Sequence, residues 1–219
     1  DFQFYVMELV EGAVPLKKLI GTQENPFFEN ALAGLGLLGD LISAIAACEE
    51  KGIIHRDLSP ANVLVTPLKA PKIIDFGICQ TDEHETITLT DEGVGTPSYM
   101  APECEPGAGS VITCRADLYS AAKVMWSAIT NQSAFARETP VFTHRSMVSM
   151  FPNNPSLWHL HHIFEKTIRS NPNNRWATCE EALKELYYIR FLVASHCPPL
   201  ELLEQRCPMC GFGKLGSFE

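Results

Sequence analysis

A polar stretch, His55-Arg56-Asp57-Leu58-Ser59-Pro60-Ala61-Asn62, lies between two short apolar runs at residues 53–54 and 63–65. A third short segment, Lys72-Ile73-Ile74, ends in the turn Asp75-Phe76-Gly77, which begins eighteen residues after Asp57. Short apolar runs bounded by polar turns are typical of strands. This alternation predicts paired short strands whose connecting loops carry the polar side chains.

The segments on either side of this region differ in character. Residues 2–10 are apolar and rich in strand-forming residue types. Residues 30–51 have helical periodicity, and Gly52 is well placed to end that helix. A polar loop at 80–95 is long for a compact domain, which favours a functional role. Helical patterns fill most of the rest, at 116–130, 157–169 and 178–191. The sequence therefore predicts an α+β fold that is mainly helical.

The composition is that of a folded domain. The chain has 219 residues, of which 46% are apolar and 20% charged, with a formal charge of −9. This acidic balance argues against a nucleic-acid-binding surface. The chain begins at Asp1 in what already reads as a strand, so we expect a preceding part to be lacking. No signal-peptide pattern opens the chain and Asp40 interrupts the most apolar stretch, so we expect a cytoplasmic domain without a membrane segment.

Seven of the eight cysteines fall into two groups. The first five lie singly in apolar or helix-like contexts, which predicts reduced, buried thiols rather than a disulfide framework. Cys207 and Cys210 instead form a pair whose spacing suits tetrahedral zinc. His196 and Cys197 are poorly spaced to complete four ligands. The tail at 196–219 therefore resembles half of a zinc ribbon.

A further motif closes the polar loop, with Gly95-Thr96-Pro97 followed by Ala101-Pro102-Glu103. Together with the motifs at 55–62 and 75–77, it resembles the eukaryotic-type protein kinases in a bacterial-like serine/threonine form. The resemblance covers roughly residues 2–191 and implies a kinase-like fold, a fragment with hinge and helical C-terminal lobe but lacking most of the N-lobe. It divides the chain into the last N-lobe strand and hinge (1–12), the C-lobe (13–195) and the tail (196–219).

The resemblance assigns the chemistry to the two polar turns. Asp57 orients the substrate hydroxyl and accepts its proton, while Asn62 and Asp75 are ligands of the Mg²⁺ that bridges the phosphates of ATP. Taken alone, Asp57 would be interpreted as a capping or turn aspartate, as most loop aspartates are, but the ordered set of motifs disfavours that alternative. Ser59 replaces the lysine that usually neutralises the transferring phosphate, so turnover is expected to be slower unless another cation substitutes.

The same resemblance places the nucleotide base at the hinge. Met7 lies beside the adenine, Glu8 and Val10 bind its edge through backbone groups, and Leu64 forms an apolar floor. Apolar walls with a few backbone polar groups suit such a pocket. Because hinge residues act through their backbone, a buried edge strand remains the alternative for residues 2–10.

Five residues are implied to have structural roles. His55 and Phe76 pack the catalytic loop against the metal loop. Asp117 accepts hydrogen bonds from the backbone of the catalytic loop. Arg175 pairs with Glu103, which joins the polar loop to the helical half.

Regulation is implied by Arg56, which stands next to the catalytic aspartate and can pair with a phosphorylated residue. Thr88 and Thr90 lie where bacterial-type relatives carry phosphothreonines. The alternative is that these threonines are only solvated loop residues. Asp91 and Glu92 then supply a constant negative charge.

The motif around Thr96, in the substrate loop, favours serine/threonine over tyrosine kinases. The predicted function is ATP-dependent phosphoryl transfer to Ser/Thr hydroxyls of protein substrates by the full-length protein, with the chain alone expected to be inactive. A non-catalytic pseudokinase or scaffold that binds a protein partner is the alternative. A small-molecule phosphotransferase is disfavoured, since that class lacks Ala-Pro-Glu with its distant arginine.

Overall fold

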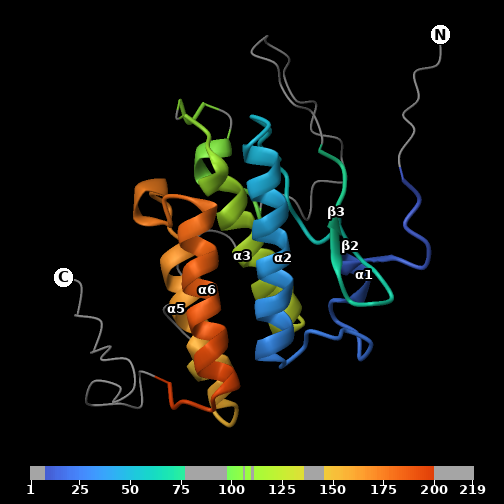
Figure 1. Cartoon of the computed structure of the whole chain (residues 1–219), viewed down its shortest axis with the longest axis vertical. Coiled ribbons are helices and arrows are strands. Elements are labelled where there is room, and N and C mark those ends of the chain that lie inside the picture. The colour runs from blue at the N-terminus through green and yellow to red at the C-terminus, as the bar shows by residue number, and fades with distance from the viewer. Residues whose placement is uncertain (1–7, 77–97, 106, 110, 136–145, 200–219) are drawn as a thin grey trace.

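The computed structural model describes residues 8–76, 98–105, 107–109, 111–135 and 146–199. A body of helices lies beside a small sheet (Figure 1). The long helices are α2 (Ala31–Glu49), α3 (Cys114–Thr130), α5 (Pro155–Thr167) and α6 (Cys179–Ala194). Short helical segments are α1 (Leu16–Leu19), α4 (Met147–Met150) and the 3₁₀ turns η2 (Pro102–Cys104) and η4 (Pro172–Asn174). The prediction of a mainly helical α+β fold is confirmed.

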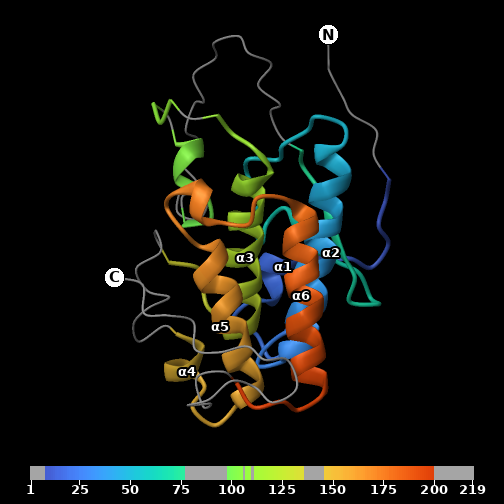
Figure 2. The ribbon, with the colours of Figure 1, turned by 60° about the vertical axis from the view of Figure 1, so that its left-hand side comes forward.

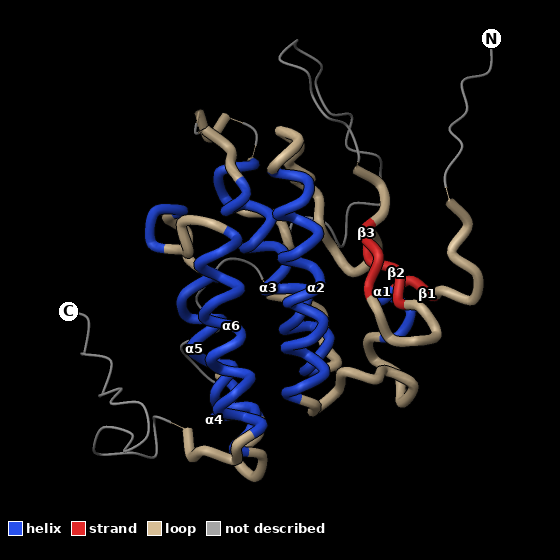
Figure 3. The backbone as a smooth tube through the Cα atoms, viewed as in Figure 1, coloured by secondary structure: helices blue, strands red, loops and turns tan. Residues whose placement is uncertain are grey.

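The sheet contains β1 (Val14–Pro15), β2 (Val63–Val65) and β3 (Pro71–Ile73), which pair antiparallel in that order. It lies at one side of the helices, next to α1 (Figure 3). Val63 and Val65 are buried while Leu64 is half-buried, because successive strand residues face opposite sides. Leu64 therefore lies on the face of β2 turned away from the core.

The first predicted strand, at 2–10, is wrong for the part that the structure describes. Residues 8–10 are in no strand, and Val14 is the first described residue to join the sheet. A strand needs a partner for its backbone groups, and among the described residues no neighbouring strand pairs with 8–10.

Helix α3 forms the centre of the molecule, and each of its residues except Arg115 is buried. Helix α2 packs against both α3 and α6, while α5 lies against α3 and α6 (Figures 1 and 2). By length and composition α2 could span a bilayer, but Leu35, Leu38 and Leu41 are buried in the core. This burial is expected of the core helix of a folded domain.

Local sequence signals explain where α2 begins and ends. The side chain of Asn30 accepts a hydrogen bond from the backbone amide of Ala33, as expected of an N-cap. At the other end Gly52 has a φ of 71°, and its amide donates to Glu49 O. The left-handed backbone at Gly52 reverses the chain, so the helix ends at Glu49 rather than at residue 51.

A glycine allows α2 and α3 to approach closely, and this contact yields a prediction. A Cβ at Gly34 would clash with the side chain of Ile129, whereas a Cβ at Gly36 would meet nothing within 4 Å. We expect Gly34→Ala to lower the free energy of unfolding by about 1–3 kcal/mol through overpacking. Gly36→Ala should raise it by about 0.5–1 kcal/mol, because alanine favours helices. Urea unfolding of both variants measures this, and equal effects would contradict the close contact.

Candidate active site

Backbone amides of the loop that contains Asp57 form hydrogen bonds to the first turn of α3. The carboxylate of Asp117 accepts hydrogen bonds from the amide of His55 (2.8 Å, to Oδ2) and from that of Arg56 (2.9 Å, to Oδ1). Asp117 is only 1% exposed, and this burial raises the pKa of its carboxyl, although the two amides act in the opposite direction. Arg56 has a φ of 66°, so the loop turns sharply just before Asp57.

Asp57 and Asn62 contact each other across the loop. Asn62 Nδ2 donates to the backbone oxygen of Asp57 at 2.8 Å and to its carboxylate Oδ2 at 3.3 Å. Since Nδ2 is used in these bonds, Oδ1 is the atom with which Asn62 can bind a cation. The strand that leads to Asp75 is tied to the same point, because the amide of Ile74 donates to Asn62 O at 2.9 Å.

Asp75 is exposed and has a φ of 53°, a left-handed conformation that is uncommon for aspartate. Burial raises the pKa of the Asp57 carboxyl above its ordinary value, and the negative charge of Asp75 raises it further. The charge of His55 and the hydrogen bond from Asn62 act in the opposite direction. Asp57 therefore interacts electrostatically with both Asn62 and Asp75.

His55 links the two polar turns. Its Nε2 lies 3.0 Å from Ile74 O, and its ring centroid lies 5.1 Å from that of Phe76. His55 is 2% exposed, whereas Phe76 is 42% exposed. The two rings therefore pack together at the edge of the core, next to the backbone of the metal loop.

The residues around the expected base pocket are described in part. Glu8 is exposed and Val10 is half-buried, and Val10 O accepts a hydrogen bond from the amide of Ala13 at 3.2 Å. Leu64 is half-buried and lies on the face of β2 turned away from the core. Ser59, where the resemblance expects a lysine, is only 7% exposed.

Glu103 and Arg175 form a buried bidentate ion pair. Arg175 Nη1 lies 2.6 Å from Glu103 Oε1, and Nη2 lies 2.9 Å from Oε2. The guanidinium also donates to the backbone oxygens of Arg169 (2.8 Å) and Arg115 (3.0 Å), and it lies 4.6 Å from the ring centroid of Tyr119. Because the charge and nearly all donors are matched, the pair can be buried.

Lys123 is a residue that the sequence analysis did not single out. It is 0% exposed in the middle of α3, and its Nζ donates to Ser98 O (2.6 Å) and to Phe135 O (2.9 Å). It also lies over the rings of Tyr119 and Phe135 at 4.8 and 5.2 Å. The available signal was a single lysine within an otherwise apolar helical pattern. Lys123 ties the segment that follows the polar loop to the central helix.

We expect Lys123→Met to lower the free energy of unfolding by about 1–3 kcal/mol. Methionine keeps the length of the side chain but leaves the partly buried oxygen of Ser98 and the buried oxygen of Phe135 without this donor. Lys184→Met is the matched control, because Lys184 is exposed on α6. Urea unfolding compares the two variants, and equal midpoints would contradict this role for Lys123.

Several predicted site residues lie outside the described residues. They are the gatekeeper position, the two regulatory threonines, the substrate-loop threonine and the cysteine pair of the tail: Met7, Thr88, Thr90, Thr96, Cys207 and Cys210.

The geometry of the two polar turns agrees with a comparison of sequences. The profile of the family described as "Protein kinase domain" matches residues 1–188. The chain belongs to this family. Protein kinases use ATP and Mg²⁺ and act on protein substrates, and Asn62 Oδ1 with the Asp75 carboxylate are oxygen donors of the kind that Mg²⁺ requires.

Curated relatives of this kinase domain include three bacterial proteins. The chain is 31% identical over 191 residues to serine/threonine-protein kinase PknB of Mycobacterium tuberculosis, covering 84% of this chain and 30% of that protein. It is 29% identical over 214 residues to PknB of Mycolicibacterium smegmatis, covering 94% and 33%. It is 32% identical over 197 residues to a probable serine/threonine-protein kinase of Clostridium acetobutylicum, covering 87% and 29%. The kinase domain thus spans about a third of the length of these relatives.

Proposed function

We propose that the chain supplies the phosphoryl-transfer site of an ATP-dependent serine/threonine protein kinase. The arrangement of Asp57 carries this proposal: Asn62 binds its carboxylate, and Asp117 fixes the preceding backbone. A group fixed in this way costs little reorganisation when a substrate hydroxyl arrives. The names of the curated relatives support the serine/threonine class.

Each residue of the site then has one task. Asp57 orients the hydroxyl of the substrate and accepts its proton, and its raised pKa makes the carboxylate a better base than an ordinary aspartate. Asn62 and Asp75 hold Mg²⁺, which neutralises charge on the phosphates when it is bound. Glu8, Val10 and Leu64, with Met7, hold the adenine.

Regulation, domain division and location complete the proposal. Thr88 and Thr90 become phosphorylated, and the phosphate pairs with Arg56, the residue that precedes Asp57 in the sequence. The chain divides into hinge (1–12), C-lobe (13–195) and tail (196–219), and Cys207 and Cys210 of the tail supply two zinc ligands. The protein acts in the cytoplasm on protein substrates.

A phosphotransfer assay of the complete gene product tests this function. The protein is incubated with Mg²⁺ and ATP and with peptides that differ only in carrying serine, threonine or tyrosine. We expect transfer to serine and threonine that stops when a chelator removes Mg²⁺. Absence of transfer to every peptide and to protein substrates would contradict the proposal and leave a non-catalytic scaffold. Preferred transfer to tyrosine would contradict the assigned specificity.

A further inference from the structure

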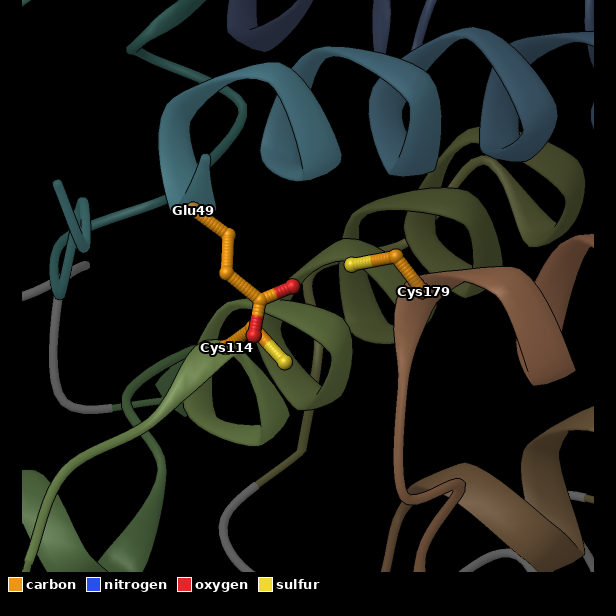
Figure 4. A group of neighbouring side chains, drawn as sticks. All are labelled: Glu49, Cys114 and Cys179. Carbon is orange, nitrogen blue, oxygen red and sulfur yellow. The ribbon is translucent and has the colours of Figure 1, made fainter. Parts of the chain in front are cut away.

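Three side chains that could bind a metal ion meet at the first turn of α3. Glu49 is the last residue of α2, while Cys114 and Cys179 are the first residues of α3 and α6. One carboxylate oxygen and the two Sγ atoms all lie within 4.8 Å of one another. Figure 4 shows the three side chains converging from three separate helices.

The burial of these groups differs in a way that suits a bound ion. Cys114 and Cys179 are each 3% exposed, whereas Glu49 is exposed. Two buried sulfur ligands with one carboxylate at the surface leave an access route from solvent. A water would be the fourth ligand, as in zinc sites that have three protein ligands.

The helix dipoles favour a thiolate at each cysteine and a cation next to Glu49. Each thiol lies at the N-terminus of a long helix, where the helix dipole favours a thiolate. Glu49 lies at the C-terminus of α2, where the dipole favours a cation.

We propose that Glu49, Cys114 and Cys179 bind one zinc ion that joins the ends of α2, α3 and α6. Each thiol loses its proton to water when the ion binds, and no redox step is involved. Zinc ligands at about 2.3 Å stand about 3.8 Å apart in a tetrahedron, so the observed cluster needs only a small contraction. Glu49 lies six residues before His55, so the ion would brace the segment that leads into the catalytic loop.

Metal binding by the full chain tests this site, provided that the two cysteines of the tail are replaced. The background variant carries Cys207→Ser and Cys210→Ser, so that the tail pair contributes no thiolate ligand. We expect it to bind one equivalent of zinc. With cobalt(II) as the probe, we expect the near-ultraviolet charge-transfer absorption of thiolate ligands. Absence of this absorption, or a Cys114–Cys179 disulfide found by mass spectrometry in the purified protein, would overturn the proposal.

Substitutions in the same background assign the ligands. Cys114→Ser and Cys179→Ser should each reduce the cobalt absorption, and Cys48→Ser should leave it unchanged. Glu49→Gln should weaken zinc affinity by more than about 100-fold, because losing even an outer partner costs 10- to 100-fold. Glu50→Gln, one residue further on, should not.

Thermal melting keeps the test decisive if a cysteine variant fails to fold. Glu49 is exposed, so Glu49→Gln should fold. We expect zinc to raise the melting temperature of the background variant and of Glu50→Gln, but to raise that of Glu49→Gln much less. Equal shifts for the two glutamine variants, or an unchanged cobalt spectrum when both cysteines are replaced, would show that these residues only hydrogen-bond in the core.

Discussion

In the complete gene product, we expect Asp57→Asn to reduce kcat for peptide phosphorylation by about 100- to 10,000-fold, the range that general base catalysis contributes. Asparagine matches the shape of aspartate but cannot accept the hydroxyl proton. The loop should stay in place, because Asp117 binds the backbone of His55 and Arg56 rather than any side chain. The melting temperature of the variant should therefore stay close to that of the wild type.

Asp40→Asn is the matched control for this experiment. It makes the same chemical change at an exposed position of α2 and should leave kcat unchanged. Equal activities of Asp57→Asn and the wild type would remove the catalytic role of Asp57. A large loss of kcat in Asp40→Asn would show that the assay does not specifically measure catalysis at Asp57.

The largest effect on stability is expected for Arg175→Ala. Removing one partner of a buried ion pair leaves the other charge uncompensated and costs about 3–5 kcal/mol. Here the unpaired group is Glu103, which is 7% exposed. For a chain of this size we expect the melting temperature to fall by about 6 to 20 °C, since 1 kcal/mol corresponds to about 2–4 °C.

Arg169→Ala provides the comparison for Arg175→Ala. Arg169 Nη2 lies 3.4 Å from Glu165 Oε1 in a partly exposed i,i+4 pair, and such pairs contribute about 0–1 kcal/mol. The backbone oxygen of Arg169 that binds Arg175 remains in the variant. A melt of Arg175→Ala that matched the melt of Arg169→Ala would refute the structural importance of the buried pair.

The parts of the site that could be predicted from sequence are those whose residues lie close together in ordered motifs. Asp57 and Asn62 share one loop, and the spacing to Asp75 fits a short pair of strands. The pairing of Glu103 with Arg175 came instead from family resemblance, since nothing in local periodicity connects residues so far apart.

The rest depends on which helix faces meet, and a single sequence does not contain that information. The thiols of Cys114 and Cys179 each looked like an isolated buried thiol until α3 and α6 were placed side by side. Lys123 gave only a weak signal, because a charge in an apolar helix identifies neither its depth nor its acceptors. Nothing in the sequence marks Gly34 as a contact position, while the structure shows that its missing side chain leaves space for Ile129.

The ion pair between Glu103 and Arg175 also has a consequence for how the domain comes apart. Arg175 follows η4, whereas Glu103 lies in η2, and the backbone oxygens of Arg115 and Arg169 bind the same guanidinium. If the turn at η4 opened alone, the buried carboxylate of Glu103 would lose its positively charged partner. The segments that carry Glu103 and Arg175 must therefore open together. The start of α3 and the connection from α5 to α6 therefore form one cooperative unfolding unit, although dozens of residues separate them along the chain.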